Sequence, residues 1–299
     1  MKLSIPIGYL RERYGMERAL TLVKEAGFDA VDFSLSQMEK SDFPFNGSDW
    51  QDYARELRRI SDEIGVPINQ THAPIRFSPE QWADGAFIMD VYERALAISG
   101  ILGAKVSVIH PFHYSEIDGR VEECFEKNMR FYGDLIPAAV QAGVRIGVEN
   151  MWRRDPRRRF ISYDTCSEAA EFVRYIDTLN HDSVVACLDI GHVGLIPQKD
   201  EAWDVIRALG HRRLHALHVH DNDYCNDYHQ VPYTGKIDWA EVTRALGEID
   251  YDGDFTYETS AAFLGNMDDR FLPTGLKFMS DVGRHLMMLV DESRPAESK

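Results

Sequence analysis

The sequence predicts a single-domain (β/α)8 barrel. Eight short apolar runs rich in β-branched residues begin 26 to 39 residues apart, and stretches with apolar positions at helical spacing fill the intervals. Strands that alternate with helices in this way are typical of a parallel sheet joined by helical crossovers. The 299 residues suit one closed barrel, and no linker or low-complexity tract divides them. We therefore expect residues 1–290 to form the barrel and residues 291–299 to form a polar tail.

The predicted strands recur at a nearly regular interval. A period in this range also occurs in solenoid repeats, but the leucine-rich consensus of such repeats is absent from the sequence. In chain order the runs are LSIPIGYL from Leu3, DAVDFSL from Asp29, INQTHAP from Ile68, VSVIHP from Val106, RIGVEN from Arg145, VVACLDIGH from Val184, HALHVHDND from His215 and DFTYETS from Asp254.

Helical periodicity occupies the intervals between these runs. Four of the helical stretches end in a glycine just before the next strand, at Gly27, Gly65, Gly103 and Gly143. Glycine readily adopts the left-handed conformation that ends a helix, so these positions support the predicted boundaries. The stretches cover residues 16–27, 50–65, 87–103, 121–143, 165–179, 200–209 and 238–249.

The composition is that of a globular protein. With 44% hydrophobic and 27% charged residues it excludes a mainly disordered or fibrous chain. The 33 basic and 49 acidic residues give a net charge of −16, which argues against broad electrostatic binding of nucleic acid or an anionic membrane. No run approaches the ~20 apolar residues of a membrane span. The four cysteines contain no CxxC pair, so we expect a reduced, cytoplasmic protein.

Chemically active side chains gather at one end of the predicted barrel. In such barrels the active site forms at the carboxyl ends of the strands. A single histidine or glutamate there is more often a hydrogen-bonded structural residue, but six of the eight predicted strands deliver an imidazole or carboxylate to this end. The residues are His72, His110, Glu149, Asp189 with His192, His218 with His220, and Glu258.

The carboxylates in this set point to a metal ion. Glu149, Asp189 and Glu258 would repel one another at a shared edge unless protons or a cation neutralise them. Oxygen and imidazole ligands together suit Mn²⁺, Co²⁺, Mg²⁺ or Zn²⁺. We therefore expect a divalent metal at the carboxyl ends of the strands.

Four motifs resemble those of a known family. GVEN, LDIGH, HVHDND and YETS, which contain Glu149, Asp189, His220 and Glu258, are similar to motifs of the sugar phosphate isomerase/epimerase family. That family belongs to the xylose isomerase-like barrel superfamily, which also includes ketose 3-epimerases, inosose dehydratases and endonuclease IV. The resemblance implies that these four residues bind one divalent metal, most often Mn²⁺, and that Glu149 and Glu258 also transfer protons. It implies that His192 contacts the substrate.

The implied activity is isomerisation or epimerisation of a sugar, keto-sugar or related polyol. A metal that binds a carbonyl and a neighbouring hydroxyl stabilises the enediolate left when the adjacent proton is removed. One glutamate would remove the proton and the other would return one on the opposite face. A lyase or dehydratase acting on a keto-sugar or an inosose starts with the same step, so that alternative stays open.

A zinc phosphodiesterase is the rival interpretation, because the chain also resembles endonuclease IV. That family binds three zinc ions, and this chain has a counterpart for each ligand, including its Asp-x-His element at residues 227–229. The acidic charge and the lack of interleaved basic and aromatic residues weigh against nucleic acid as substrate. The additional candidates for metal or substrate binding are His72, His110, His192, Asp227 and His229.

One basic segment, RRDPRRRF at residues 153–160, follows Glu149. Arg153 or Arg154 could bind a phosphate or carboxylate through paired hydrogen bonds, although a solvated loop or a contact between subunits explains the segment equally well. Trp152 could stack on the apolar face of a sugar.

We therefore expect a small, sugar-like substrate bound by His192, Trp152, Arg153 and Arg154. Near Asn226, where ketose 3-epimerases have a substrate-binding arginine, the sequence departs from the family and weakens an assignment to free ketoses in particular. The sequence leaves open whether the chain forms a homo-oligomer.

Overall fold

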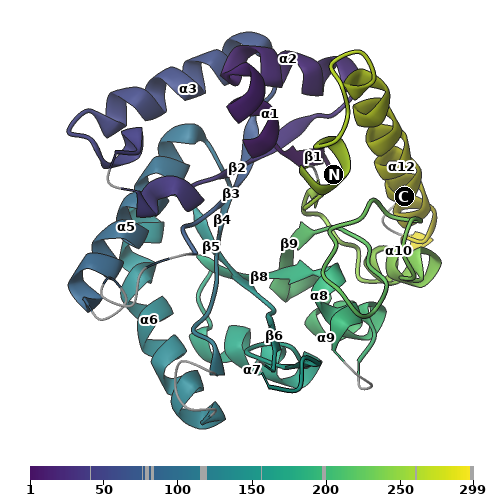
Figure 1. Cartoon of the computed structure of the whole chain (residues 1–299). Coiled ribbons are helices and arrows are strands. Elements are labelled where there is room, and N and C mark those ends of the chain that lie inside the picture. Colours follow the sequence, from purple (N-terminus) through teal and green to yellow (C-terminus); the bar gives the residue numbers. More distant parts are fainter. Residues whose placement is uncertain are drawn as a thin grey trace.

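Eight parallel strands form a barrel with helices around its outside, which confirms the predicted fold class (Figure 1). The computed structural model describes residues 1–40, 42–75, 77, 81, 84–114, 120–155, 157–196, 200–259 and 261–296. The strand order is β10-β1-β2-β3-β4-β5-β8-β9, and a parallel bridge between Val219 and Tyr257 links the last strand to the first. The strands are β1 (Leu3–Pro6), β2 (Ala30–Ser34), β3 (Ile68–His72), β4 (Val106–Ile109), β5 (Arg145–Glu149), β8 (Val184–Asp189), β9 (Leu214–His218) and β10 (Phe255–Thr256).

The helices between the strands end where the glycines predict. Gly27, Gly65, Gly103 and Gly143 follow α2, α3, α5 and α6 with φ angles of 97°, 77°, 86° and 67°. The main helices are α1 (Gly8–Tyr14), α2 (Met16–Ala26), α3 (Trp50–Ile64), α5 (Gly85–Leu102), α6 (Val121–Ala142), α7 (Ala169–Leu179), α9 (Ala202–Arg213), α10 (Trp239–Glu248) and α12 (Leu272–Glu292). None of the described helices combines the length and apolar composition that crossing a bilayer requires.

Several short elements at the carboxyl ends of the strands were not predicted. The arginine-rich segment is part of an antiparallel hairpin of β6 (Trp152–Arg154) and β7 (Ile161–Tyr163), and its Pro156 lies outside the described residues. Asp155 shapes the turn by accepting hydrogen bonds from two backbone N–H groups. The other additions are α8 (Ile190–Leu195), α11 (Ala261–Leu264) and the 3-10 helices η1 (Ser36–Glu39) and η2 (Pro44–Asn46).

The C-terminal segment begins as helix. The predicted tail overlaps the end of α12, which continues to Glu292, and residues 297–299 lie outside the described part of the chain.

Small apolar side chains fill one side of the barrel interior. Val106 and Val108 of β4 pack with Val185 and Cys187 of β8 and with Ala216 of β9. Side chains alternate between the two faces of a strand, so the residue two positions further along points the same way. The inward-pointing residues of β8 and β9 therefore change along each strand, from small apolar residues to polar residues at the carboxyl end.

Gly147 of β5 lies among these interior residues. A Cβ atom built at Gly147 would lie 2.9 Å from Cγ1 of Val106 and 3.3 Å from Cβ of Cys187. Gly147→Val should therefore crowd the barrel interior and lower the free energy of unfolding by about 2 kcal/mol. Urea denaturation would measure the change. Gly133→Ala is the control, because Gly133 is an exposed residue of α6 and a Cβ atom built there has no other atom within 4 Å. This variant should not be destabilised. Equal stability of Gly147→Val and the wild type would contradict this packing.

Candidate metal centre and active site

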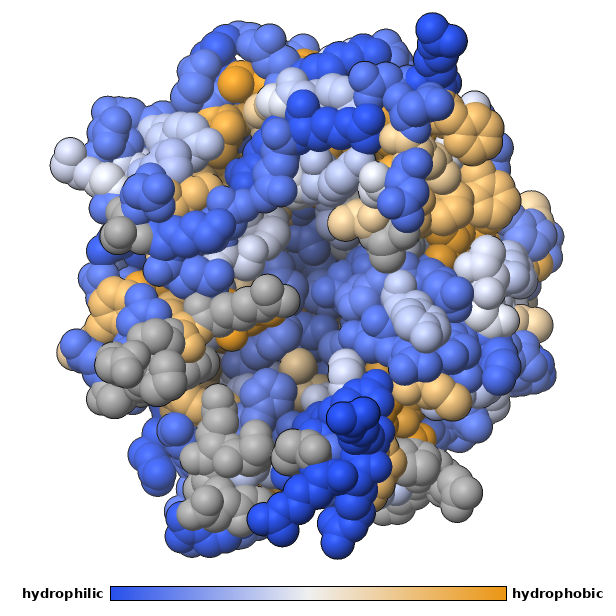
Figure 2. Space-filling model, in the orientation of Figure 1, coloured by the Kyte–Doolittle hydropathy of each residue, from blue (hydrophilic) through white to orange (hydrophobic). Residues whose placement is uncertain are grey.

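The predicted site residues meet at the carboxyl ends of the strands, around a hollow bordered mainly by hydrophilic residues (Figure 2). Each predicted metal or substrate residue from the strand ends and the loop after β9 has a nitrogen–oxygen contact of less than 4 Å with another member of the set. The set is His72, His110, Glu149, Asp189, His192, His220, Asp227, His229 and Glu258.

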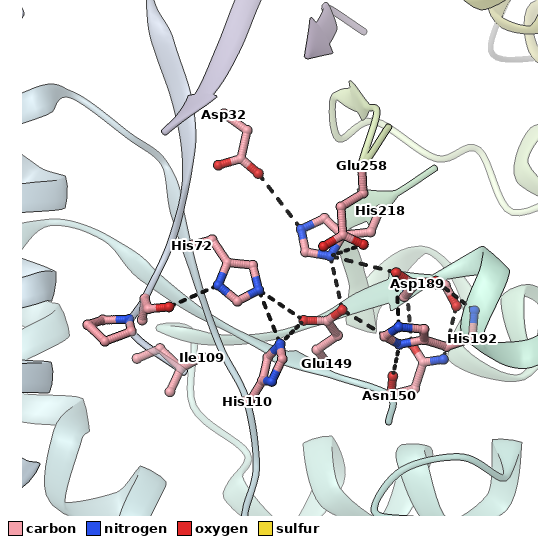
Figure 3. A network of polar contacts seen from close by, with 12 residues as sticks. Asp32, His72, Ile109, His110, Glu149, Asn150, Asp189, His192, His218 and Glu258 are labelled. Carbon is pink, nitrogen blue, oxygen red and sulfur yellow. Dashed lines mark hydrogen bonds and ion pairs between the residues drawn. The ribbon is translucent and has the colours of Figure 1, made fainter. Parts of the chain in front are cut away.

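Glu149 is the centre of one half of the cluster. It is the last residue of β5 and is fully buried. Its Oε1 accepts a hydrogen bond from Nδ1 of His218 at 3.0 Å, and its Oε2 lies 3.0 Å from Nε2 of His110 and 3.5 Å from Nε2 of His72 (Figure 3). Three imidazoles from separate parts of the barrel therefore surround one carboxylate.

The charge states in this half follow from burial and from these contacts. Burial alone would raise the pKa of Glu149, but the imidazoles of His218 and His110 together outweigh burial and hold the pKa well below its usual value. Burial opposes charge on His218 as well, yet the carboxylates of Glu258 and Glu149 raise the pKa of His218 to about 10. Glu149 and His218 thus form a buried ion pair at neutral pH.

Asp189 organises the other half. Its Oδ1 lies 3.0 Å from Nε2 of His220 and accepts the backbone N–H of His192 in the first turn of α8. Asn150 makes three hydrogen bonds that stabilise this arrangement. Its Oδ1 accepts the backbone N–H of Asp189, and its Nδ2 donates to the Asp189 carbonyl. Its own carbonyl accepts a hydrogen bond from Nδ1 of His192 at 2.8 Å. The GVEN and LDIGH motifs are therefore joined by direct hydrogen bonds.

Glu258 and the loop after β9 close the cluster. Oε2 of Glu258 lies 3.6 Å from Nδ1 of His218 and 3.9 Å from Nε2 of His220. His229 lies beside it, with Nδ1 donating to the Glu258 carbonyl at 2.6 Å and Nε2 at 3.1 Å from Oδ2 of Asp227. Burial raises the pKa of Glu258 to about 7, and the nearby carboxylates of Asp189 and Glu149 contribute to the rise.

The donor set suits a divalent metal. The buried Oε2 of Glu258 and Oδ1 of Asp227 have no hydrogen-bond partner, and acceptor atoms without donors favour a cation. In the described part of the chain, three groups have possible ligand atoms within 4.8 Å of one another: His72, Glu149, His218 and Glu258; Asp189, His192 and His220; and His220, His229 and Glu258.

The predicted four-ligand set is spread across these groups. Glu149 belongs to the first and Asp189 to the second, whereas His220 and Glu258 each belong to two. The groups therefore share members and form one continuous cluster.

The predicted substrate residues lie beside this cluster. The rings of Trp152 and His192 are in edge contact, with centroids 6.3 Å apart. Nε of Arg153 donates to the Tyr163 carbonyl across the hairpin. Arg154 is exposed, with its guanidinium 5.9 Å from the centre of the Trp152 ring. The hairpin therefore places Trp152 against His192 of the cluster, whereas the contacts of Arg153 and Arg154 are within the hairpin.

His218 and Asp32 are site residues that the sequence analysis did not assign a role. Asp32 lies in the middle of β2, is 4% exposed, and has its Oδ2 3.8 Å from Nε2 of His218. Nε2 of Gln70 on β3 donates to the same oxygen at 3.2 Å. In the sequence, the signal for Asp32 is a carboxylate inside an apolar strand. The alternation of side chains along the strand places it on the face that points into the barrel.

A second buried carboxylate, Asp221, holds the loop that contains Asp227 and His229. Asp221 is fully buried directly after His220. Its two oxygens accept four hydrogen bonds, from the backbone N–H groups of residues 222, 233 and 237 and from Nε1 of Trp239. These contacts fold residues 222–237 back over the end of β9 and bring Asp227 toward His220.

Comparisons with known proteins agree with the fold and with the predicted family. Residues 20–279 match the sequence model of the xylose isomerase-like TIM barrel family. A D-psicose 3-epimerase from Enterocloster bolteae is 30% identical over 265 residues, covering 85% of this chain and 80% of the relative. A D-psicose 3-epimerase from Ruminiclostridium cellulolyticum is 26% identical over 274 residues, covering 86% and 83%.

A solved structure supports the same fold. D-psicose 3-epimerase with D-tagatose from Clostridium cellulolyticum H10 has a TM-score of 0.72 to this chain, with 19% identity, and the alignment covers 96% of this chain and 99% of that one. At this level of identity the likeness shows the barrel architecture.

Replacing Asp221 tests the support of the loop. Asp221→Asn puts an amide N–H₂ group against N–H donors in a fully buried position, so the free energy of unfolding should fall by about 3 kcal/mol. Urea denaturation would measure it, with the exposed Asp252→Asn as control. A loss no larger than that of the control would mean that Asp221 does not hold the loop.

Proposed function

Because the chain belongs to the xylose isomerase-like TIM barrel family, we propose that it is a divalent-metal-dependent isomerase or epimerase of a sugar, keto-sugar or related polyol. The observation that supports this most strongly is the pair Glu149 and Glu258, which flank His218 at 3.0 Å and 3.6 Å within a cluster of possible metal ligands. The D-psicose 3-epimerases that the chain resembles suggest a ketose-like substrate.

The metal ligands in this proposal are Glu149, Asp189, His220 and Glu258, with Mn²⁺ as the favoured ion. The unpartnered oxygen of Glu258 and the raised pKa of its carboxyl support a cation there. When bound, a divalent ion would polarise the substrate carbonyl and stabilise negative charge on the neighbouring oxygens.

The protein supplies the proton transfers. A carboxylate that removes a proton from the carbon next to the carbonyl needs a partner that returns one to the other face. Glu149 is the last residue of β5, and Glu258 lies two residues after β10. Which glutamate removes the proton depends on the stereochemistry of the substrate. The ion pair with His218 would keep Glu149 ionised and oriented.

The surrounding side chains bind and orient the substrate. His192 is held by Asn150 and the Asp189 carboxylate, so its ring has one orientation toward the cluster. Trp152 covers the edge of His192 and would stack on a sugar face. Arg153 and Arg154 would interact only with a substrate that extends as far as the hairpin.

A zinc phosphodiesterase is the second candidate, because four further residues also join the cluster. His72 and His110 contact Glu149, and Asp227 and His229 contact each other and lie beside His220. A site for one ion does not need them as ligands, whereas a site for several zinc ions would use them.

Metal content separates the two candidates. Elemental analysis of protein purified without chelator or metal-affinity resin should find about one Mn, Co or Mg per chain. Removing the ion with EDTA should lower the melting temperature by about 5 °C, because it restores charge repulsion in the cluster, and Mn²⁺ should reverse this. Two or three Zn per chain would favour phosphodiester hydrolysis, and protein free of divalent metal with an unchanged melting temperature would contradict both.

The proton-transfer roles are tested by amide substitutions. Glu149→Gln and Glu258→Gln should each slow the exchange of the C3 proton of D-psicose in deuterium oxide at least 100-fold, since an amide cannot accept the proton. NMR of the sugar would follow the exchange, and Glu56→Gln, an exposed residue on α3, is the control. Exchange at half the wild-type rate or more in either variant would refute the role of that glutamate.

A further inference from the structure

A second pocket lies at the amino ends of β5, β8 and β9, away from the metal cluster. It has a volume of about 300 Å³ and is partly open to solvent. Arg145 on its wall is the first residue of β5, whereas Glu149 of the cluster is the last. With a rise of about 3.3 Å per residue, the strand separates the two sites by roughly 13 Å. The pocket is therefore at the opposite end of the barrel from the candidate active site.

The lining of this pocket is positively charged, although the chain has a net charge of −16. Among the described lining residues there are three arginines and two histidines, and the only carboxylate is that of Asp182. The basic residues are Arg145, His181, Arg212, Arg213 and His215. Positive charge concentrated in one pocket raises the local concentration of anions, so this lining favours an anionic ligand.

Arg145 supplies a guanidinium that the fold leaves unused. The side chain is half-buried, and within the described residues no hydrogen bond or ion pair engages its N–H groups. Burial and the positive charge of Arg145 lower the pKa of His215, which indicates that the two side chains are close together. A guanidinium has five N–H donors in a fixed plane and binds the oxygen atoms of oxyanions in pairs. Arg145 and His215 thus form one wall of a site for an oxyanion.

Arg212 and Arg213 form another wall, at the end of α9. Nε and Nη2 of Arg213 donate to the carboxylate of Asp177 at 2.7 Å, and Nη2 of Arg212 donates to the same carboxylate at 2.7 Å. One carboxylate therefore orients two guanidinium groups and leaves one positive charge in excess. Cations at the end of a helix also stabilise its dipole, which explains these two arginines but not Arg145 at the start of a strand. The Arg212 side chain is 66% exposed, so a ligand can reach it.

A neighbouring pocket shares Arg145 and His215 but is less suited to an anion. It is also lined by Lys105, and by the carboxylates of Asp252 and Asp254. Oδ1 of Asp252 lies 3.5 Å from Nδ1 of His215. An anion in this neighbouring pocket would be repelled by two carboxylates, so the pocket with three arginines is the better site.

The shape of the pocket with three arginines indicates which anion it fits. Liquid water occupies about 30 Å³ per molecule, so the volume equals that of about ten water molecules and exceeds the volume of a phosphate group. Ile176, Val184 and Val185 provide an apolar part of the lining for a carbon skeleton. One guanidinium can pair with both oxygens of a planar carboxylate, whereas a phosphate group has three terminal oxygens for donors from several elements.

We propose that this pocket binds a small phosphate monoester, with the phosphate oxygens at Arg145 and Arg212 and the carbon skeleton against Ile176 and Val184. The site uses none of the candidate metal ligands, so the proposal does not depend on the proposed function. A molecule held at the amino ends of the strands does not reach the metal cluster, so it is a ligand distinct from the substrate.

Calorimetric titration of the protein as purified, at constant ionic strength, tests the site. The wild type should bind glycerol 3-phosphate at least 10-fold more tightly than succinate, a dicarboxylate of equal charge. Arg145→Gln and Arg212→Gln should each weaken binding of glycerol 3-phosphate about 10-fold or more, because each removes charge-assisted hydrogen bonds. Arg130→Gln, an exposed arginine on α6, is the matched control and should bind within about twofold of the wild type.

Two further variants and a second ligand make the result specific. Arg145→Lys keeps the charge and should fold even if the glutamine variant does not, and its affinity should lie between those of the wild type and Arg145→Gln. Glu258→Gln, altered in the metal cluster, should bind glycerol 3-phosphate like the wild type. Inorganic phosphate should bind more weakly than glycerol 3-phosphate, since it leaves the apolar lining unused. Equal affinity for the two would identify the free ion as the ligand and contradict the monoester.

Three results would overturn the site itself: no detectable binding of either phosphate compound by the wild type, unchanged affinity in Arg145→Gln, or equal affinity for succinate. Loss of binding in Glu258→Gln with normal binding in Arg145→Gln would place the phosphate at the metal cluster instead. The exchange of the sugar proton is measured separately, so neither result decides the other.

Discussion

Repulsion among buried carboxylates is the constraint on which the rest of this structure depends. Glu149, Asp189, Asp227 and Glu258 lie within a few ångströms of shared imidazoles, where burial limits the screening of their charges by water. The imidazoles offset part of the charge, most directly where His218 pairs with Glu149. They do not offset all of it, since burial and the neighbouring carboxylates leave the pKa of Glu258 raised to about 7. Such a cluster is tolerated where it serves binding or catalysis.

The barrel holds this cluster with rigid elements and with neutral hydrogen bonds. Glu149 and Asp189 are strand ends, so the backbone ladder sets their positions, and Asn150 joins the two through its side-chain amide. Asp221 fixes the loop after β9 by accepting four hydrogen bonds. Below them, the small residues of β4, β8 and β9 pack the interior. Side chains held in this way lose little entropy when they bind an ion or a substrate.

The two sides of the cluster differ in chemistry. Toward β1 and β2 lies a pocket whose wall contains carboxylates and serines and, in the described residues, one imidazole as its only basic group. Toward the hairpin of β6 and β7 the ring of Trp152 contacts His192, and Arg154 is exposed to solvent. In the proposed function, a substrate bound to the metal would have one end beside hydrogen-bond acceptors and the other beside an aromatic ring. This asymmetry would restrict the orientation of the substrate.

The sequence by itself determined the barrel, the order of its strands and the edge at which the candidate site residues gather. Period-2 and helical patterns, glycine caps and strand-end motifs are local properties, so they can be read without knowing which strands are neighbours. Only the tertiary structure decided the partners: that His218 pairs with Glu149, that Asn150 links two motifs, that residues 222–237 bring Asp227 to His220, and that one buried oxygen of Asp32 has no hydrogen-bond partner. These outcomes depend on the curvature of the closed barrel and on loop conformation, which bring together residues as distant in the sequence as Glu149 and His218, 69 positions apart. No local pattern encodes such distances.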